Sequence, residues 1–215
     1  MNARWRRWLK PYRAAARRRR NQVFLEVIET VPRPVRILDV GGTQRFWEVV
    51  GLTDASQVEV VIGNVRAMPT RYANFSSEVL DARSLRFEDE QFDVVFSNSV
   101  IEHVGTLDDQ RKVAVEVRRV GKRYFVQTPN RYFPIEPHFY FPWFQFLPVS
   151  VRVLLVHRLP LTPGGPIKDR AVAREKVEEI RLMTFKEIQA MFPGAVIRRE
   201  KVLGLTKSFM IYAER

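Results

Sequence analysis

The chain has 215 residues, of which 46% are hydrophobic and 12% aromatic, a length and composition typical of one globular domain with a full core. It contains no cysteine, which excludes disulfides, thiolate metal ligands and cysteine nucleophiles. The formal net charge is +12, but residues 1–20 hold nine basic residues and no acidic one, so the remainder is close to neutral.

The basic segment 1–20 interleaves its arginines with Trp5, Trp8 and Tyr12. Arginine-rich segments with interfacial aromatic residues are typical of surfaces that bind anionic lipid. We therefore predict a basic amphipathic tail over 1–20 that contacts an anionic membrane surface, followed by a folded domain over 21–215. A mitochondrial transit peptide and a nonspecific polyanion-binding terminus remain alternatives. We expect a cytoplasmic protein, peripheral at the inner membrane face.

The remainder of the chain alternates helical patterns with short apolar runs. Apolar residues at helical spacing predict a helix over 21–31, which prolines then end. Thr106 caps a second predicted helix over 108–120, and Thr184 opens a capping box for a third that runs to residue 191. The predicted strands are 35–40, 58–62, 77–80, 92–96, 123–127, 195–202 and 208–213.

This alternation predicts an α/β fold, with a mostly parallel sheet of seven strands and helices on both faces. Each of the first five strands ends in a small or polar cluster. Because ligands of such sheets bind beyond the carboxyl ends of the strands, we expect the functional site at that edge.

Residues 131–182 interrupt the alternation with prolines and aromatic residues. They cannot cross a bilayer as one helix, because Pro142, Pro148 and Arg152 interrupt the apolar stretch. Long inserts in compact domains are usually functional. We predict that this insert lies over the carboxyl edge of the sheet as a lid and forms an acceptor pocket.

Three segments in order resemble class I methyltransferases of the methyltransferase-11 and UbiE-like type: RILDVGGTQRFW at 36–47, DAR at 81–83 and FDVVFSNSVIEHV at 92–104. The resemblance extends from about residue 35 to the C-terminus and includes TPNRYFPIEPHFYFP at 128–142. It implies a Rossmann-like class I fold, S-adenosylmethionine as cofactor and transfer of its methyl group.

The resemblance assigns the turn after the first strand to the cofactor. It implies that Asp39 attracts the ammonium group of the methionine part, and that Gly41 and Gly42 let the backbone approach the ligand closely. The family carries further glycines where this chain has Thr43 and Arg45, a departure that bears on cofactor affinity. An ordinary strand-to-helix turn is the alternative.

The other predicted cofactor residues follow the next strands. Asn64 occupies the position where the family has an acidic residue for the ribose hydroxyls, and a plain turn is the alternative. Asp81 and the Ala82 amide match the position that reads adenine, with a loop-capping aspartate as the alternative. The predicted cofactor-binding set is completed by Thr43, Arg83, Ser97 and Asn98.

The candidate bases are histidines. By resemblance, Glu102 and His103 lie beneath the reacting centre, where His103 could act as general base, although packing at the start of a helix is an alternative. His138, which Glu136 could orient, competes for that role. No two of the three histidines have a metal-ligand spacing, so we expect no metal site, and His157 is interpreted as structural.

The implied function is O-methylation of a small-molecule, glycan or lipid-linked acceptor by direct displacement on S-adenosylmethionine. One alternative is a catalytically degenerate binding module at a membrane surface. An RNA methyltransferase is a weaker one, because the Asp/Asn-Pro-Pro-aromatic motif of base-amine enzymes is missing after the fourth strand, at 97–100. The near-neutral domain also lacks a basic stripe, so we do not expect nucleic acid as partner.

Overall fold

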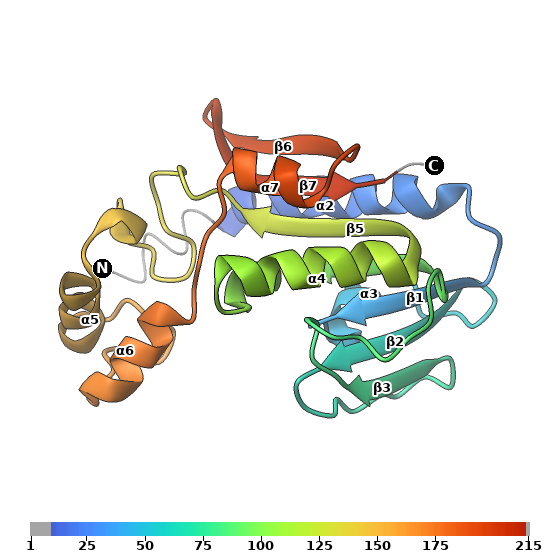
Figure 1. The fold of residues 1–215 in the computed structure, drawn as a ribbon, viewed down its shortest axis with the longest axis horizontal. Coiled ribbons are helices and arrows are strands. Elements are labelled where there is room, and N and C mark those ends of the chain that lie inside the picture. Colours follow the sequence, from blue (N-terminus) through green and yellow to red (C-terminus); the bar gives the residue numbers. More distant parts are fainter. Residues whose placement is uncertain (1–9, 214–215) are drawn as a thin grey trace.

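The computed structural model describes residues 10–213, with side chains from residue 17 onward. It contains a seven-stranded sheet covered by helices on both faces and a helical insert beyond one edge (Figure 1). The strands are β1 (Val35–Val40), β2 (Val58–Asn64), β3 (Phe75–Val79), β4 (Phe92–Asn98), β5 (Gly121–Pro129), β6 (Val196–Val202) and β7 (Leu205–Tyr212). The α-helices are α2 (Lys10–Glu29), α3 (Gln44–Val50), α4 (Leu107–Val120), α5 (Val149–Arg158), α6 (Arg170–Glu178) and α7 (Phe185–Met191), with 3₁₀ turns at Ile101–His103 and Phe144–Phe146.

The strand order is β3-β2-β1-β4-β5-β7-β6. The pairs among β1 to β5 are parallel, and β7 lies antiparallel to both β5 and β6. The predicted seven-stranded, mostly parallel sheet is therefore confirmed. The order reverses between β1 and β4, the point at which open α/β sheets form their ligand crevice.

Two apolar cores lie on opposite faces of the sheet. On one face Val113 and Val117 of α4 pack with Ile188 of α7. On the other face Phe24 of α2 and Trp47 of α3 pack against the strands. The central strands β1, β2, β4 and β5 are apolar on both sides because helices cover both faces, which explains why they read as continuous apolar runs in the sequence. The outer strands β3 and β6 are largely exposed.

The helices α4 and α7 begin where the sequence predicts a cap at Thr106 and a capping box at Thr184, and both starts are capping boxes in the structure. Thr106 Oγ1 accepts a hydrogen bond from the Asp109 amide, and Asp109 Oδ2 accepts one from the Thr106 amide, at 3.2 and 3.0 Å. Thr184 and Glu187 make the same reciprocal pair at the start of α7. Both starts follow from local side-chain chemistry, since each box satisfies two backbone donors that a helix terminus leaves free.

Helix α2 crosses the predicted boundary between tail and domain. It begins at Lys10, ahead of the predicted start at residue 21, and continues without interruption through residue 20. The aromatic residues Trp5 and Trp8 of the predicted membrane segment lie outside the described residues, as does the side chain of Tyr12. None of the helices within residues 10–213 is both long and apolar enough to cross a membrane.

The insert 131–182 forms a small core of its own beyond the carboxyl end of β5 (Figure 1). Its helices α5 and α6 pack together around aromatic residues, and Phe139 and Phe144 are only 2% and 1% exposed. Aromatic residues of the predicted lid therefore serve in part to fold the insert itself. The core consists of Phe139, Phe144, Val153, Val156, Leu161, Ala173 and Val177.

Candidate functional site

A cavity of about 950 Å³ opens at the carboxyl ends of β1 to β4. Its size lies within the range of small-molecule and cofactor pockets. Of the predicted site residues it is lined by Gly41, Asn64, Asp81, Ala82, Arg83 and His103. The lining does not include the other predicted site residues, which are Asp39, Gly42, Thr43, Ser97, Asn98, Glu136 and His138.

The turn after β1 is shaped by contacts within the protein. Gly41 has a φ of +75°, and a Cβ at this position would lie 2.6 Å from the side chain of Val100. A Cβ on Gly42 would lie 1.9 Å from Oδ2 of Asp39. A glycine is therefore required at position 42 because any side chain there would collide with the buried carboxylate of Asp39. The sequence predicted a different reason, namely that Gly42 lets the backbone approach a ligand closely.

Asp39 lies beneath this turn and is fully buried. Its Oδ2 accepts a hydrogen bond from Trp47 Nε1 at 2.8 Å, whereas Oδ1 has no hydrogen-bond partner among the described residues. Burial raises the pKa of Asp39 to about 7. The Asp39 carboxyl group thus supports the turn from below. Thr43, the N-cap residue of α3, is exposed, and its side chain makes no capping hydrogen bond.

Polar residues after β2 and β3 form the far end of the cavity. Asn64 Oδ1 accepts from the Val65 amide at 2.8 Å, and its Nδ2 donates to the Gly42 carbonyl at 3.3 Å. The carboxylate of Asp81 is held by Arg83, with a shortest contact of 2.6 Å, and this hydrogen bonding lowers the pKa of Asp81. Oδ1 accepts from the Arg83 amide and Nε, and Oδ2 accepts from Nε and Nη2. Three N–H groups thus share the about four lone-pair sites of this carboxylate, which leaves about one for a ligand.

Arg20 of α2 reaches the ends of β4 and β5, a contact that the sequence analysis missed. Its Nη1 donates to Asn98 Oδ1 at 2.8 Å and to Gln127 Oε1 at 2.6 Å. Its Nη2 lies 3.5 Å from Glu200 Oε2. Asn98, predicted as a cofactor residue, is therefore held by Arg20 of α2. Ser97, also predicted as a cofactor residue, is buried, and its hydroxyl has no hydrogen-bond partner among the residues described.

A pattern in the sequence could have revealed Arg20. It precedes Phe24 by four residues and Val27 by seven, so it continues the apolar stripe of the helix. The prediction of a basic tail over 1–20 assigned Arg20 to that tail, so its place in the apolar stripe was not recognised. By contrast, Glu78 also lines the cavity, from an exposed position at the end of β3, and no local pattern marks it.

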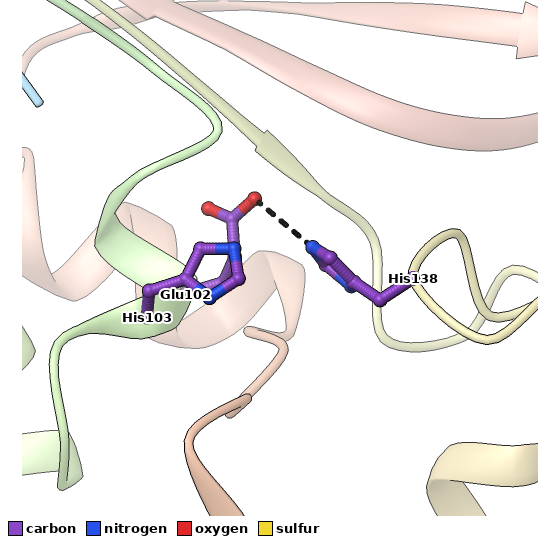
Figure 2. A group of neighbouring side chains, drawn as sticks. All are labelled: Glu102, His103 and His138. Carbon is purple, nitrogen blue, oxygen red and sulfur yellow. Dashed lines mark ion pairs between the residues drawn. The ribbon is translucent and has the colours of Figure 1, made fainter. Parts of the chain in front are cut away.

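Glu102, His103 and His138 meet at the edge of the cavity, although 34 residues separate the last two along the chain (Figure 2). Glu102 Oε1 lies 4.0 Å from His138 Nε2, and the two imidazole rings meet edge to face with centroids 4.8 Å apart. Glu102 is fully buried, and burial raises its pKa to about 7. The structure thus brings both predicted bases to one place beside a carboxyl group.

Both histidines are held by carboxylates. His138 Nδ1 lies 2.6 Å from Glu136 Oε1, and Glu136 Oε2 accepts from the amides of His138 and Phe139. This is the orienting role predicted for Glu136. His103 Nδ1 lies 3.1 Å from Glu179 Oε1, which reaches the cavity from the insert. In each ring Nε2 is the nitrogen left to face a ligand.

Comparison with known proteins finds a similarity to methyltransferase domains. Residues 40–124 match the methyltransferase domain family. Two uncharacterized proteins from strains of Mycobacterium tuberculosis are each 37% identical to this chain over 76 residues. That segment covers 35% of this chain and 26% of the relatives, so the chain spans about a quarter of their length.

Solved structures share the fold. The 1,6-didemethyltoxoflavin-N1-methyltransferase of Burkholderia thailandensis, with bound 1,6-didemethyltoxoflavin and S-adenosylhomocysteine, superposes with a TM-score of 0.56 and 11% identity, over 92% of this chain and 77% of that one. A SAM-dependent methyltransferase from Aquifex aeolicus has a TM-score of 0.51 and 12% identity, over 90% and 87%. The resemblance to class I methyltransferases is confirmed by the matched family and by this fold.

Proposed function

We propose that this chain, with the class I methyltransferase fold and a methyltransferase domain match over residues 40–124, transfers a methyl group from S-adenosylmethionine to an acceptor. The observation that carries the proposal is the cavity at the carboxyl ends of β1 to β4. It lies at the point where open α/β sheets bind ligands, and it contains Gly41, Asn64 and Asp81, which the resemblance assigns to the cofactor.

The residues around this cavity fit an adenosyl cofactor. Gly41 and Gly63 line it, so no side chain at these two positions occupies its space. Asn64 and Asp81 offer oxygen acceptors to ribose hydroxyls and to an exocyclic amine. When bound, the cofactor supplies a methyl group already activated on a sulfonium, so the protein has mainly to align the acceptor and exclude water.

The acceptor atom in this proposal is a hydroxyl oxygen of a small-molecule, glycan or lipid-linked compound. A hydroxyl must lose its proton as it attacks, and two imidazoles lie beside the cavity. The Glu136 carboxylate orients His138 at 2.6 Å, and Glu179 does the same for His103 at 3.1 Å. Either neutral ring could accept the proton through Nε2.

A catalytically degenerate module remains the rival of this proposal, and calorimetry separates the two. We would titrate S-adenosylhomocysteine into the wild-type chain, the Asp81→Ala variant and the Asp54→Ala variant. Asp81 lines the cavity, whereas Asp54 is an exposed aspartate outside it, so the second variant controls for loss of a surface charge. We expect one-to-one binding that weakens about tenfold in Asp81→Ala, the loss of roughly one hydrogen bond, and is unchanged in Asp54→Ala.

Absence of binding at millimolar S-adenosylhomocysteine would refute the cofactor assignment. Binding without methyl transfer to any acceptor tested would favour the degenerate module. A screen of hydroxylated acceptors with labelled methyl donor, with RNA as a further arm, then tests the acceptor class. Labelling of RNA alone would overturn the small-molecule assignment.

We also propose that the chain contacts an anionic membrane through its N-terminal segment. Arg17, Arg18 and Arg19 are exposed on α2. On the insert, Tyr132 and Phe146 stack at 6.0 Å, are 61% and 43% exposed, and lie beside an exposed tryptophan. Arg131 lies 5.9 Å above the Phe146 ring, and exposed aromatic residues beside an arginine favour the bilayer interface.

Vesicle cosedimentation tests this contact. A chain lacking residues 1–16 is the better truncation, because removal of 1–20 would also remove Arg20 from the ends of β4 and β5. We expect the truncation to lower binding to anionic vesicles and to leave S-adenosylhomocysteine binding intact. Vesicle binding equal to that of the full chain would refute the role of the tail.

A further inference from the structure

The carboxyl group of Glu102 is buried, and one of its two oxygens lacks a hydrogen-bond partner among the described residues. Its side chain has no exposure, and only Oε2 receives a hydrogen bond, from Thr128 Oγ1 at 3.1 Å. Oε1 has no hydrogen-bond partner within the described part of the chain. Leaving a buried carboxyl oxygen unpaired costs free energy, so such an atom indicates a partner supplied from outside the chain.

The surroundings of Oε1 are those of a metal centre. Glu102, His103 and His138 each present a ligand atom, and the three atoms lie within 4.8 Å of one another (Figure 2). Two donors with metal bonds of about 2.1 Å lie about 3.4 Å apart in a tetrahedral site and about 4.2 Å apart when opposed in an octahedral one, and the 4.0 Å between Glu102 Oε1 and His138 Nε2 falls between these values. The oxygen and the ring nitrogen can therefore bind one ion with little movement.

The second layer of contacts also matches a metal site. Histidine ligands commonly donate their other ring N–H to a carboxylate, which fixes the tautomer and orients the ring. Here Glu136 holds Nδ1 of His138 and Glu179 holds Nδ1 of His103. Glu136 is itself 2% exposed and accepts two backbone amides, so its position is rigid.

The local charges favour a cation. Three carboxyl groups surround the two imidazoles, namely Glu102, Glu136 and Glu179. The neighbouring guanidinium of Arg20 is engaged by Glu200 at 3.5 Å, and Lys176 is engaged by Glu179 at 2.7 Å. A divalent ion would pair the free oxygen of Glu102 and complete the site.

We propose that Glu102, His103 and His138 bind a divalent transition-metal ion of the zinc, manganese or iron(II) class at the edge of the cavity. Two imidazoles and one carboxylate leave coordination positions open for an oxygen ligand. An acceptor hydroxyl bound there would be held in place and made easier to deprotonate. That role rests on the proposed function, whereas binding of the ion does not.

This inference departs from the expectation that the chain has no metal site. That expectation considered spacing along the sequence, where His103 and His138 are far apart. The fold joins them because the 3₁₀ turn after β4 and the loop after β5 leave neighbouring parallel strands at the same edge.

Direct metal binding tests the inference. The tag-free chain would be treated with chelator, dialysed, and titrated with Co²⁺ by visible absorption and with Zn²⁺ and Mn²⁺ by calorimetry. The chain suits this assay, because it has no cysteine and only three histidines. We expect one equivalent of ion to bind, with a loss of affinity of about 10- to 100-fold when the orienting carboxylate is removed in Glu136→Gln.

The ligand variants His138→Ala and Glu102→Gln should weaken binding at least as much. His138 is partly exposed, so its variant is expected to fold, and circular dichroism checks Glu102→Gln. The matched control is His157→Gln, because Nδ1 of His157 lies 3.0 Å from the Ile167 carbonyl, within the insert. No binding by the wild-type chain, or equal binding by His138→Ala, would overturn the inference.

S-adenosylhomocysteine calorimetry on the same samples separates this inference from the proposed function. Binding of the nucleoside without binding of any of the three ions would refute the metal site and leave the methyltransferase assignment standing. Binding of an ion that depends on His138, without binding of the nucleoside, would support the metal site and refute that assignment.

Discussion

The buried carboxyl of Asp39 should make the stability of this protein depend on pH. Burial raises the pKa of Asp39 from 3.8 to about 7. Because the folded state holds the proton more tightly than the unfolded state, the stabilisation is complete below pH 3.8 and is lost as the pH rises through 7. At 1.36 kcal/mol for each pKa unit, the loss amounts to about 4 kcal/mol, of which about 3 kcal/mol falls between pH 5 and 8.

The Asp39→Asn variant isolates this effect. The amide has nearly the same shape, can still accept from Trp47 Nε1, and does not ionise. Urea unfolding of both proteins at pH 5, 6, 7 and 8 gives the difference in free energy of unfolding. We expect that difference to move by about 3 kcal/mol in favour of the variant as the pH rises from 5 to 8.

The Asp54→Asn variant controls for effects of pH that do not depend on Asp39. Asp54 is exposed, and the hydrogen bonds from Ser56 lower its pKa, so its carboxylate is ionised in both states throughout this range. Asp54→Asn should therefore differ from wild type by a constant amount between pH 5 and 8. A flat difference for Asp39→Asn as well would refute the argument that burial controls this carboxyl.

Two further predictions concern the turn after β1 and the contact of α2 with the sheet. Gly42→Ala would place a Cβ 1.9 Å from the buried carboxylate of Asp39 and should abolish S-adenosylhomocysteine binding in calorimetry. The control is Gly164→Ala, which should bind like wild type because open space surrounds Gly164. Arg20→Met would break the buried pair with Glu200, which keeps Lys207 at 3.6 Å, and would also remove the hydrogen bonds from Arg20 to Asn98 and Gln127. Together these losses should destabilise the protein by about 3 kcal/mol in urea unfolding. Arg36→Met, which removes an exposed pair at 3.8 Å, should cost less than about 1 kcal/mol, and equal losses for the two arginines would contradict this reasoning.

The proposed metal centre changes how the two candidate bases are understood. An imidazole that binds an ion through Nε2 has no lone pair left to accept a proton, so His103 and His138 act either as bases or as ligands. Metal-binding data on the single variants therefore bear on the chemistry as well as on the site. A chain that binds an ion tightly would deprotonate the acceptor through the ion and solvent rather than through an imidazole.

Features that depend on neighbouring residues could be predicted from the sequence alone. The strand 35–40, the cap at Thr106 and the capping box at Thr184 appear in the structure as predicted. Apolar runs, turn residues and caps act over a few positions, so their free energies are set locally. The alternation of such elements was then enough to predict the sheet and to place the cavity at its carboxyl edge.

The parts of the site that depend on long-range contacts were decided by the tertiary structure. Arg20 contacts Gln127 across 107 residues, and Glu102 meets His138 across 36. The buried position of Asp39 beneath the turn likewise depends on Trp47 and on the covering helices. No local pattern determines such contacts, because they form only when packing on both faces of the sheet brings distant segments together. The sequence alone thus determined the fold and the edge that carries the site, whereas the tertiary structure decided which side chains meet there and in what electrostatic surroundings.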